Sequence, residues 1–395
     1  MRPEPIVVTT GMGGEAYAQW VRRAIRKAVA SRGSAIPLFD SSVEEPTELL
    51  RRTIMAGFAR PITSRYQSVF VNGNPYVVET LAARYGVPED RILCTTGATS
   101  ALSLVYRAYL SPGDRVLVET PGFDLFADIA RSLGVAVDFF PRPAPRFGID
   151  PQDIAARLRP GTRLVVLSNL HNPSGMLLTD ADLASLAAAL AGRDVRIVVD
   201  EVYGDYADST ARPGSAVRLS EDFIAINSLT KIYGLSTLRC GWVVAHPDVL
   251  APVRRVSDHF EFGVSKLAHA VAALILEDSD EFDRNSRDVL AAARPVIERF
   301  FASWVAEGLV EGELPEFGCI SFPKLVGIHD TQAFSAWLAD RSGVIVAPGE
   351  FFGAPGHVRI GHAHPPDVLE RGLAQLTEGL RAYRADSKIR GSGSR

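Results

Sequence analysis

The sequence is short of cysteine and of lysine, and both shortages narrow the possibilities. Three of its 395 residues are cysteines, and they are widely scattered. That predicts neither a disulfide framework nor a zinc site. Lysine accounts for only five of the 42 lysine and arginine residues. A reaction that needs a deprotonatable amine therefore has few candidates.

Long apolar runs are missing as well. The stretch 267–276 is the longest candidate, and it falls far short of the ~20 residues that a bilayer span requires. No basic segment followed by an apolar run opens the sequence, so we expect no secretory signal. A net charge of −4 gives no general attraction to nucleic acid. We expect a soluble, cytoplasmic protein that binds neither nucleic acid nor membrane.

Several common signatures of catalysis and binding are also absent. No Gly-Lys pair exists, which excludes a P-loop, and no G-x-S-x-G elbow occurs. The glycines in 10–17 do not follow a predicted strand, so a dinucleotide site there is not expected. His362 and His364 lack a third ligand nearby, and we predict no metal site.

What is present is a regular alternation of short β-branched runs and helical periods between residues 75 and 245. Near-continuous apolar strands separated by helices are typical of a parallel sheet covered on both faces. The runs are residues 91–95, 115–119, 135–140, 163–168, 195–200, 223–228 and 241–245. The sequence therefore predicts an α/β fold with a mostly parallel seven-stranded sheet.

The pattern changes near residue 250. A long helical region, 248–309, is followed by short strands and a last helix at 366–384. This predicts a smaller α+β domain, which the N-terminal segment joins. The predicted division is a large domain at 46–250, a small domain at 1–45 and 251–386, and a flexible tail at 387–395.

Chemically useful residues follow several of the predicted strands. Lys231 comes just after the run 223–228, and Asp200 closes another run. Asn172 lies in a turn after a third strand, and residues 97–99 open a helix after a fourth. Each has an ordinary reading: a surface lysine, a helix cap, a tight turn, a helix start. Ligands in parallel sheets bind at this edge, so the combination predicts a site.

The motifs TTGATS, HNPSG, DEVYGDY, SLTK and LRCGW, in that order, resemble the fold-type-I pyridoxal-phosphate enzymes. The resemblance is to the class I/II aminotransferases of the aspartate aminotransferase superfamily, and it runs from Tyr66 to Arg359. It implies a homodimeric enzyme that uses pyridoxal 5'-phosphate to move an amino group from an amino acid to a 2-oxo acid.

The resemblance also implies roles for individual residues. Lys231 would form the Schiff base with the cofactor and then transfer the substrate proton. Asp200 would face the ring nitrogen. Asn172 and Tyr203 would donate hydrogen bonds to the ring oxygen, and Phe123 would stack on the ring.

The phosphate and the substrate would be held by further residues. Arg359 would clamp the substrate α-carboxylate, assisted by Asn172. Tyr66 would reach the phosphate of the neighbouring subunit. The phosphate ligands within the chain would be Gly97, Ala98, Thr99, Ser228 and Arg239.

Two features leave the reaction open. The segment 38–47 stands where relatives carry a glycine-containing turn that shapes the substrate pocket, and no second arginine suits a dicarboxylate. A same-fold enzyme that diverts the shared chemistry, as an oxidase, hydroxylase, lyase or cyclase, would need the same lysine and aspartate. A ligand-sensing domain is a third reading, disfavoured because no basic helix-turn-helix segment precedes residue 75.

Overall fold

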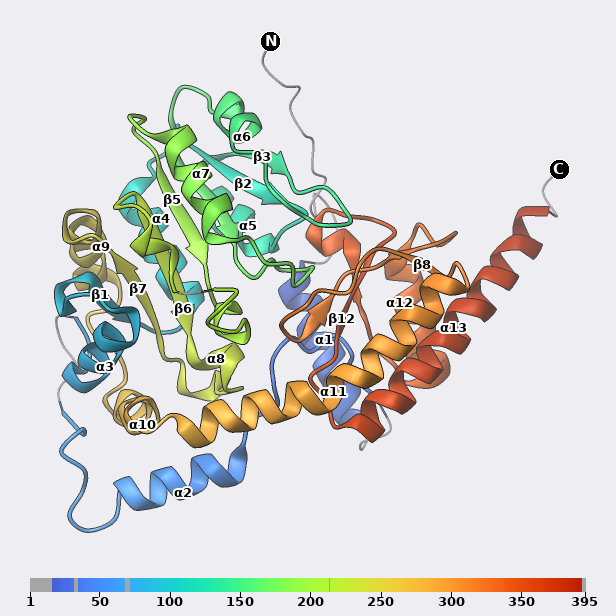
Figure 1. Ribbon diagram of the computed structural model, residues 1–395, viewed down its shortest axis with the longest axis horizontal. Coiled ribbons are helices and arrows are strands. Elements are labelled where there is room, and N and C mark those ends of the chain that lie inside the picture. The colour runs from blue at the N-terminus through green and yellow to red at the C-terminus, as the bar shows by residue number, and fades with distance from the viewer. Residues whose placement is uncertain (1–15, 32–34, 68–71, 213, 393–395) are drawn as a thin grey trace.

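A seven-stranded sheet, together with the helices that cover it, forms the larger part of the molecule (Figure 1). The computed structural model describes residues 16–31, 35–67, 72–212 and 214–392. Strand order is β1-β7-β6-β5-β4-β2-β3, and only β7 runs antiparallel to its neighbours. The strands are β1 (Ile92–Thr95), β2 (Arg115–Thr120), β3 (Ala136–Pro141), β4 (Thr162–Ser168), β5 (Arg196–Asp200), β6 (Phe223–Ser228) and β7 (Gly241–Ala245). The predicted α/β fold with a mostly parallel sheet is confirmed.

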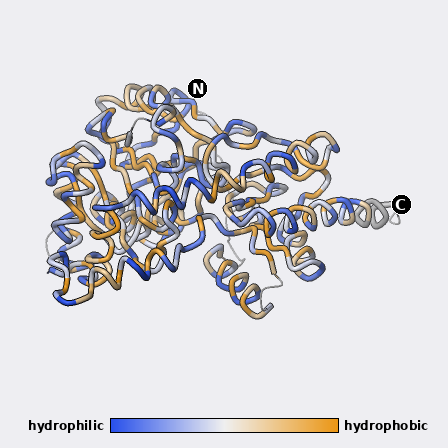
Figure 2. The backbone as a smooth tube through the Cα atoms, turned by 60° about the horizontal axis from the view of Figure 1, so that its bottom comes forward, coloured by the Kyte–Doolittle hydropathy of each residue, from blue (hydrophilic) through white to orange (hydrophobic). Residues whose placement is uncertain are grey.

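Both faces of this sheet are buried, which explains why its strands read as continuous apolar runs. Successive side chains of a strand point to opposite faces. Val165 and Val199 accordingly join one hydrophobic cluster, while Val166 and Val198 join the other. Hydrophobic segments run through the interior of this part of the chain (Figure 2).

Helices cover each face. One face packs against α3 (Pro75–Tyr85), α6 (Pro151–Arg157), α7 (Asp180–Leu190) and α10 (Lys266–Glu277). The other packs against α4 (Ala98–Tyr109), α5 (Asp124–Ser132) and α9 (Pro247–Phe260). The short helix α8 (Leu229–Ile232) follows β6 directly, and α2 (Thr47–Gly57) packs on α10.

A second hydrophobic core lies beside the sheet (Figure 1). It is built from α11 (Asp280–Ala306), α12 (Thr331–Ser342), α13 (Pro366–Ser392) and the short strands β8 (Val310–Glu311), β10 (Lys324–Leu325) and β12 (Val358–Gly361). The strands β9 (Ile320–Ser321) and β11 (Ala347–Pro348) pair with β12, but Ile320 belongs to the cluster of the sheet and Ala347 to a separate cluster around Trp20. The N-terminal helix α1 (Tyr17–Ala30) packs near this core through Trp20 and Phe351.

The two cores meet along α11, the long helix that runs under the sheet toward α13 (Figure 1). Phe282 belongs to the cluster of the sheet, whereas Ala293 belongs to the second core. The helix α9 spans the predicted boundary at residue 250 and α10 follows it, yet both pack on the sheet. Helical periodicity does not reveal which core a helix covers, and the division into domains stays a prediction.

The last helix is longer than the composition suggested. The sequence predicts a last helix at 366–384 and a flexible tail at 387–395, whereas α13 continues to Ser392. The flexibility of the tail stays a prediction. Residues 393–395 lie outside the described residues. Among the described residues, no helix combines the length and the apolar character that a membrane span requires.

Candidate active site

A cavity of about 430 Å³ opens at the carboxyl edge of the parallel strands, where β4, β5 and β6 end. Residues of the N-terminal segment and Arg359 of β12 line it together with residues at the edge of the sheet. Ten of the residues singled out in the sequence line this cavity: Ala98, Thr99, Phe123, Asn172, Asp200, Tyr203, Ser228, Lys231, Arg239 and Arg359. The structure thus brings together residues up to 261 positions apart (359 − 98).

One end of the cavity is suited to an anion. Gly97 caps α4 with φ +90°, a conformation that favours glycine, and a Cβ there would lie 2.6 Å from Nη2 of Arg239. The same guanidinium donates to the carbonyl of Thr96 over 3.2 Å. The positive end of a twelve-residue helix and an arginine fork therefore face one space.

Asp200 lines the cavity from the last position of β5. Its Oδ1 accepts a hydrogen bond from the amide of Val202 over 3.1 Å. Burial raises the pKa of this carboxyl to about 7, while the Val202 amide acts in the opposite direction. A buried acid at a strand end is costly unless it meets a cation, so this position favours a positively charged ligand group.

Lys231 enters the cavity from the single turn of α8. Its Nζ donates to Oγ of Ser41 over 3.0 Å and lies 5.7 Å from the centre of the Tyr203 ring. Burial and, secondarily, the charge of Arg359 lower the pKa of this amine. A larger fraction of the amine is therefore neutral, and nucleophilic, than for an exposed lysine.

Arg359 projects from β12 opposite Lys231 and is almost completely buried. Its Nη1 donates to Oδ1 of Asn172 over 2.9 Å, and its Nη2 donates to the carbonyl of Phe39 over 3.1 Å and to the hydroxyl of Tyr17. The guanidinium also lies 4.9 Å from the centre of the Phe352 ring. These contacts hold a planar fork at the cavity wall, suited to a carboxylate.

Two buried polar atoms of the site lack a partner among the described residues. They are the hydroxyl of Tyr203 and Nε of Arg359. Buried donors without an acceptor are rare in native proteins. Both atoms belong to residues that line the cavity, so an acceptor supplied by a ligand would satisfy them.

Two of the residues singled out in the sequence do not line the cavity. Gly97 lies just behind it, under Arg239. Tyr66 lies away from it, is 39% exposed, and packs edge-on against Phe58 with Nζ of Lys266 over its ring. Its contact with a neighbouring subunit stays a prediction.

The sequence reasoning missed several lining residues from the N-terminal segment, among them Tyr17, Asp40 and Ser41. Burial raises the pKa of Asp40, which Lys231 and Arg359 partly offset. The segment 38–47 had been singled out only as a departure from the family. An acid followed by two serines was the available signal, but no strand ends there to indicate where it points.

Comparisons with known proteins agree with this geometry. The model of the family described as aminotransferase class I and II matches residues 39–376. Capreomycidine synthase of Streptomyces vinaceus is 31% identical over 308 residues, covering 78% of each chain. Histidinol-phosphate aminotransferase 2 of Ralstonia nicotianae is 31% identical over 304 residues, covering 75% of this chain and 78% of its own. A PLP-dependent aminotransferase from Streptococcus suis has a structure similar at a TM-score of 0.81, with 26% identity over 91% of this chain and 97% of its own.

Proposed function

Because this chain belongs to the class I and II aminotransferase family, we propose that it binds pyridoxal 5'-phosphate at Lys231 and moves the amino group of an amino acid to a 2-oxo acid. The observation that carries the proposal is the single cavity shared by Lys231, Asp200 and Arg359. An amine with a lowered pKa, a buried acid and a buried guanidinium converge there.

The cavity fits this cofactor. The cradle at the start of α4 leaves no room for a Cβ at Gly97 yet presents backbone amides and Arg239 to an anion. The unpartnered hydroxyl of Tyr203 is a donor for the ring oxygen. The bound cofactor supplies an aldehyde that reacts with amines and a cationic ring that accepts electrons from the substrate α-carbon.

We assign the phosphate to the end of the cavity at α4. The amides of 97–99, the hydroxyl of Ser228 and the fork of Arg239 would hold it. Asp200 would keep the ring nitrogen protonated, because a carboxylate facing that nitrogen stabilises its positive charge. Phe123 would cover one face of the ring.

Lys231 would act as the proton carrier once substrate is bound. Its lowered pKa leaves a neutral amine able to accept the α-proton. Arg359 would hold the α-carboxylate through its fork, with Asn172 beside it. The substrate would then lie between these two residues.

The proposal is tested by tracing the cofactor to one lysine. Reduction of the purified holoenzyme with borohydride, followed by peptide mass spectrometry, should find the pyridoxyl group on Lys231. K231A should lose both this adduct and turnover. K324A is the matched control, since Lys324 pairs with Glu311 on the surface. An adduct that persists in K231A contradicts the assignment.

One observation favours a reaction other than amino-group transfer as the second candidate. A relative at 31% identity is named a synthase and not an aminotransferase. The enzyme could therefore use the same residues for a diverted reaction, as an oxidase, hydroxylase, lyase or cyclase. Incubation with single amino acids separates the cases: transfer yields a 2-oxo acid and the amine form of the cofactor, while the alternatives consume oxygen, release ammonia or form a ring.

We further propose a homodimer in the cytoplasm, with Tyr66 completing the phosphate site of the neighbouring subunit. Exposed apolar side chains support an interface: Met55 on α2, Phe260 at the end of α9 and Phe262 just after it. Sedimentation should show a dimer. Mixing Y66F with K231A chains should give hybrid dimers in which only one of the two sites has both residues intact.

A further inference from the structure

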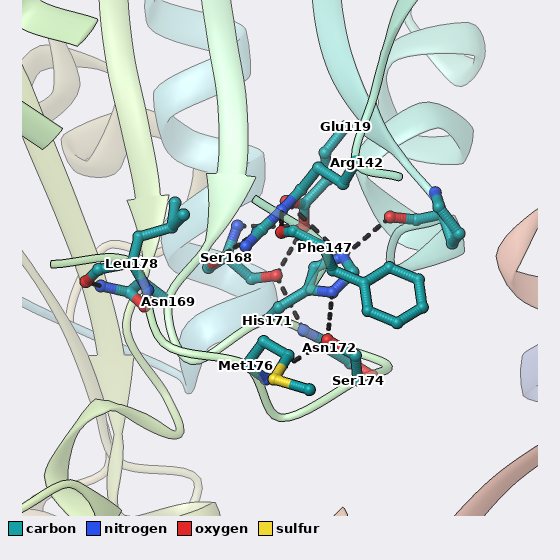
Figure 3. A network of polar contacts seen from close by, with 11 residues as sticks. Glu119, Arg142, Phe147, Ser168, Asn169, His171, Asn172, Ser174, Met176 and Leu178 are labelled. Atoms are coloured by element: carbon teal, nitrogen blue, oxygen red, sulfur yellow. Dashed lines mark hydrogen bonds and ion pairs between the residues drawn. The ribbon is translucent and has the colours of Figure 1, made fainter. Parts of the chain in front are cut away.

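A buried network of polar contacts holds the loop that carries Asn172 (Figure 3). This loop follows β4 and spans residues 169–178. The network joins it to Glu119 at the end of β2 and to Arg142 just after β3. None of these anchoring groups contacts the cavity.

Hydrogen-bond polarity in the network is fixed by its chemistry. The amide of Asn172 donates to Oγ of Ser168 over 2.9 Å. A hydroxyl has one hydrogen to donate. The Ser168 hydroxyl donates it to Oε1 of Glu119, at an oxygen–oxygen distance of 2.5 Å. The backbone amide of Ser168 donates to the same oxygen over 3.0 Å. The backbone of Asn172 is thus anchored through one hydroxyl to a buried carboxylate.

Arg142 completes the anchor. Its Nη1 donates to Oε2 of Glu119 over 2.7 Å and to the carbonyl of Ser168 over 2.9 Å, and both charged side chains are fully buried. Its Nε donates to the carbonyl of Phe147 over 2.6 Å. A buried ion pair is weak evidence for stability, since desolvation offsets its attraction. Its geometric effect is clear, because four hydrogen bonds converge on the point where β4 ends.

The other end of Asn172 faces the cavity. A guanidinium only donates, so the atom of Asn172 facing Arg359 is the acceptor Oδ1. The amide nitrogen is then turned toward the cavity as a donor. Any movement of the Asn172 backbone would carry with it both this donor and the acceptor that orients Arg359.

We propose that Glu119, Arg142 and Ser168 are positioning residues that set the placement of Asn172 and, through it, the orientation of Arg359 for a substrate carboxylate. This inference rests on the proposed function. Among the described residues, the hydroxyl of Ser168 hydrogen-bonds both Glu119 of the ion pair and the amide of Asn172. Its removal should weaken carboxylate binding without removing the cofactor.

The test compares Ser168, the buried serine that ends β4, with Ser174, a buried serine of the loop that follows. S168A removes the link and keeps the backbone amide that donates to Glu119. S174A is the matched control, because its hydroxyl bonds Nδ1 of His171 over 2.6 Å and does not touch Asn172. S168T restores a hydroxyl. The readouts are the dissociation constant of a 2-oxo acid for the holoenzyme without amino donor, followed by fluorescence, and the separate values of KM and kcat.

We expect S168A to weaken 2-oxo acid binding and raise KM by about fivefold to tenfold, the effect of losing one ordered hydrogen bond, with kcat and cofactor content changed less. S174A and S168T should bind like the parent enzyme. Parental binding in S168A, or an equal loss in S174A, overturns the inference. A parent enzyme that holds no cofactor, in contrast, contradicts the proposed function itself.

Discussion

Replacing Asp200 with asparagine should raise the folding stability of the cofactor-free protein and weaken its binding of the cofactor. Burial raises the pKa of this carboxyl from 3.8 to about 7. Between these two pH values, Asp200 therefore keeps its proton in the folded state and loses it in the unfolded chain. Folding stability falls as pH rises between these two values and is lowest above about pH 7.

The size of the effect follows from the same two values. At about 1.4 kcal/mol for each pH unit, the interval from 3.8 to about 7 corresponds to an upper limit of about 4 kcal/mol. Asparagine keeps an oxygen to accept the Val202 amide and carries no charge. The cofactor-free D200N protein should therefore be more stable than the parent by up to this amount at about pH 8, and about equally stable near pH 4.

Urea unfolding of the cofactor-free proteins across this pH range measures the difference in folding stability between D200N and the parent. D258N serves as the control, because Asp258 is exposed. Equilibrium dialysis at about pH 8 should show at least about tenfold weaker cofactor binding by D200N, since the charge facing the ring nitrogen is gone. The reasoning is refuted if the stability difference does not grow with pH, or if D200N binds the cofactor as the parent does.

Three further substitutions test the rest of the cavity. R239K should weaken cofactor binding by about tenfold in dialysis, because an ammonium cannot bind two phosphate oxygens as a guanidinium does; equal binding would contradict the phosphate assignment. G97A should lower both thermal stability, by about 1–3 kcal/mol, and cofactor content, since its Cβ would meet Arg239 at 2.6 Å. G86A adds a Cβ at a positive φ with nothing nearby, so it should lower stability alone. R359A should raise the KM for amino acids far more than the dissociation constant of the cofactor, and a parallel loss of both would count against its role.

Much of the fold and the centre of the site could be predicted because both depend on local sequence. Asp200 closes one short apolar run and Lys231 follows another. The length of these runs and their β-branched residues favour buried strands, and parallel strands end at a common edge. The alternation of these runs with helical periods predicted the sheet, and the residues at their ends predicted a site. The roles of Tyr203, Arg239 and Arg359 were implied by the resemblance to a family.

What could not be predicted depends on tertiary contact. Tyr17 and Ser41 lie in the N-terminal segment, far from any strand of the large sheet, and nothing local shows that they reach Arg359 and Lys231. The network around Glu119 was missed for a related reason. A glutamate at the end of an apolar strand is recognisable, but its partner Arg142 follows a different strand and its role depends on the loop between them.

The proposed phosphate cradle at Gly97 depends on the register of β7, the antiparallel strand beside it. Gly241 pairs with both Thr95 and Ser228, and a Cβ at this position would lie 2.5 Å from the carbonyl carbon of Gly97. A slip of one residue would put the indole of Trp242 where two glycines now touch. A misaligned chain would fold into a sheet of similar appearance yet present no cradle. The amount of cofactor bound after refolding should therefore measure the fraction of molecules with the native strand register. A secondary-structure signal would not distinguish these molecules from those with a shifted register.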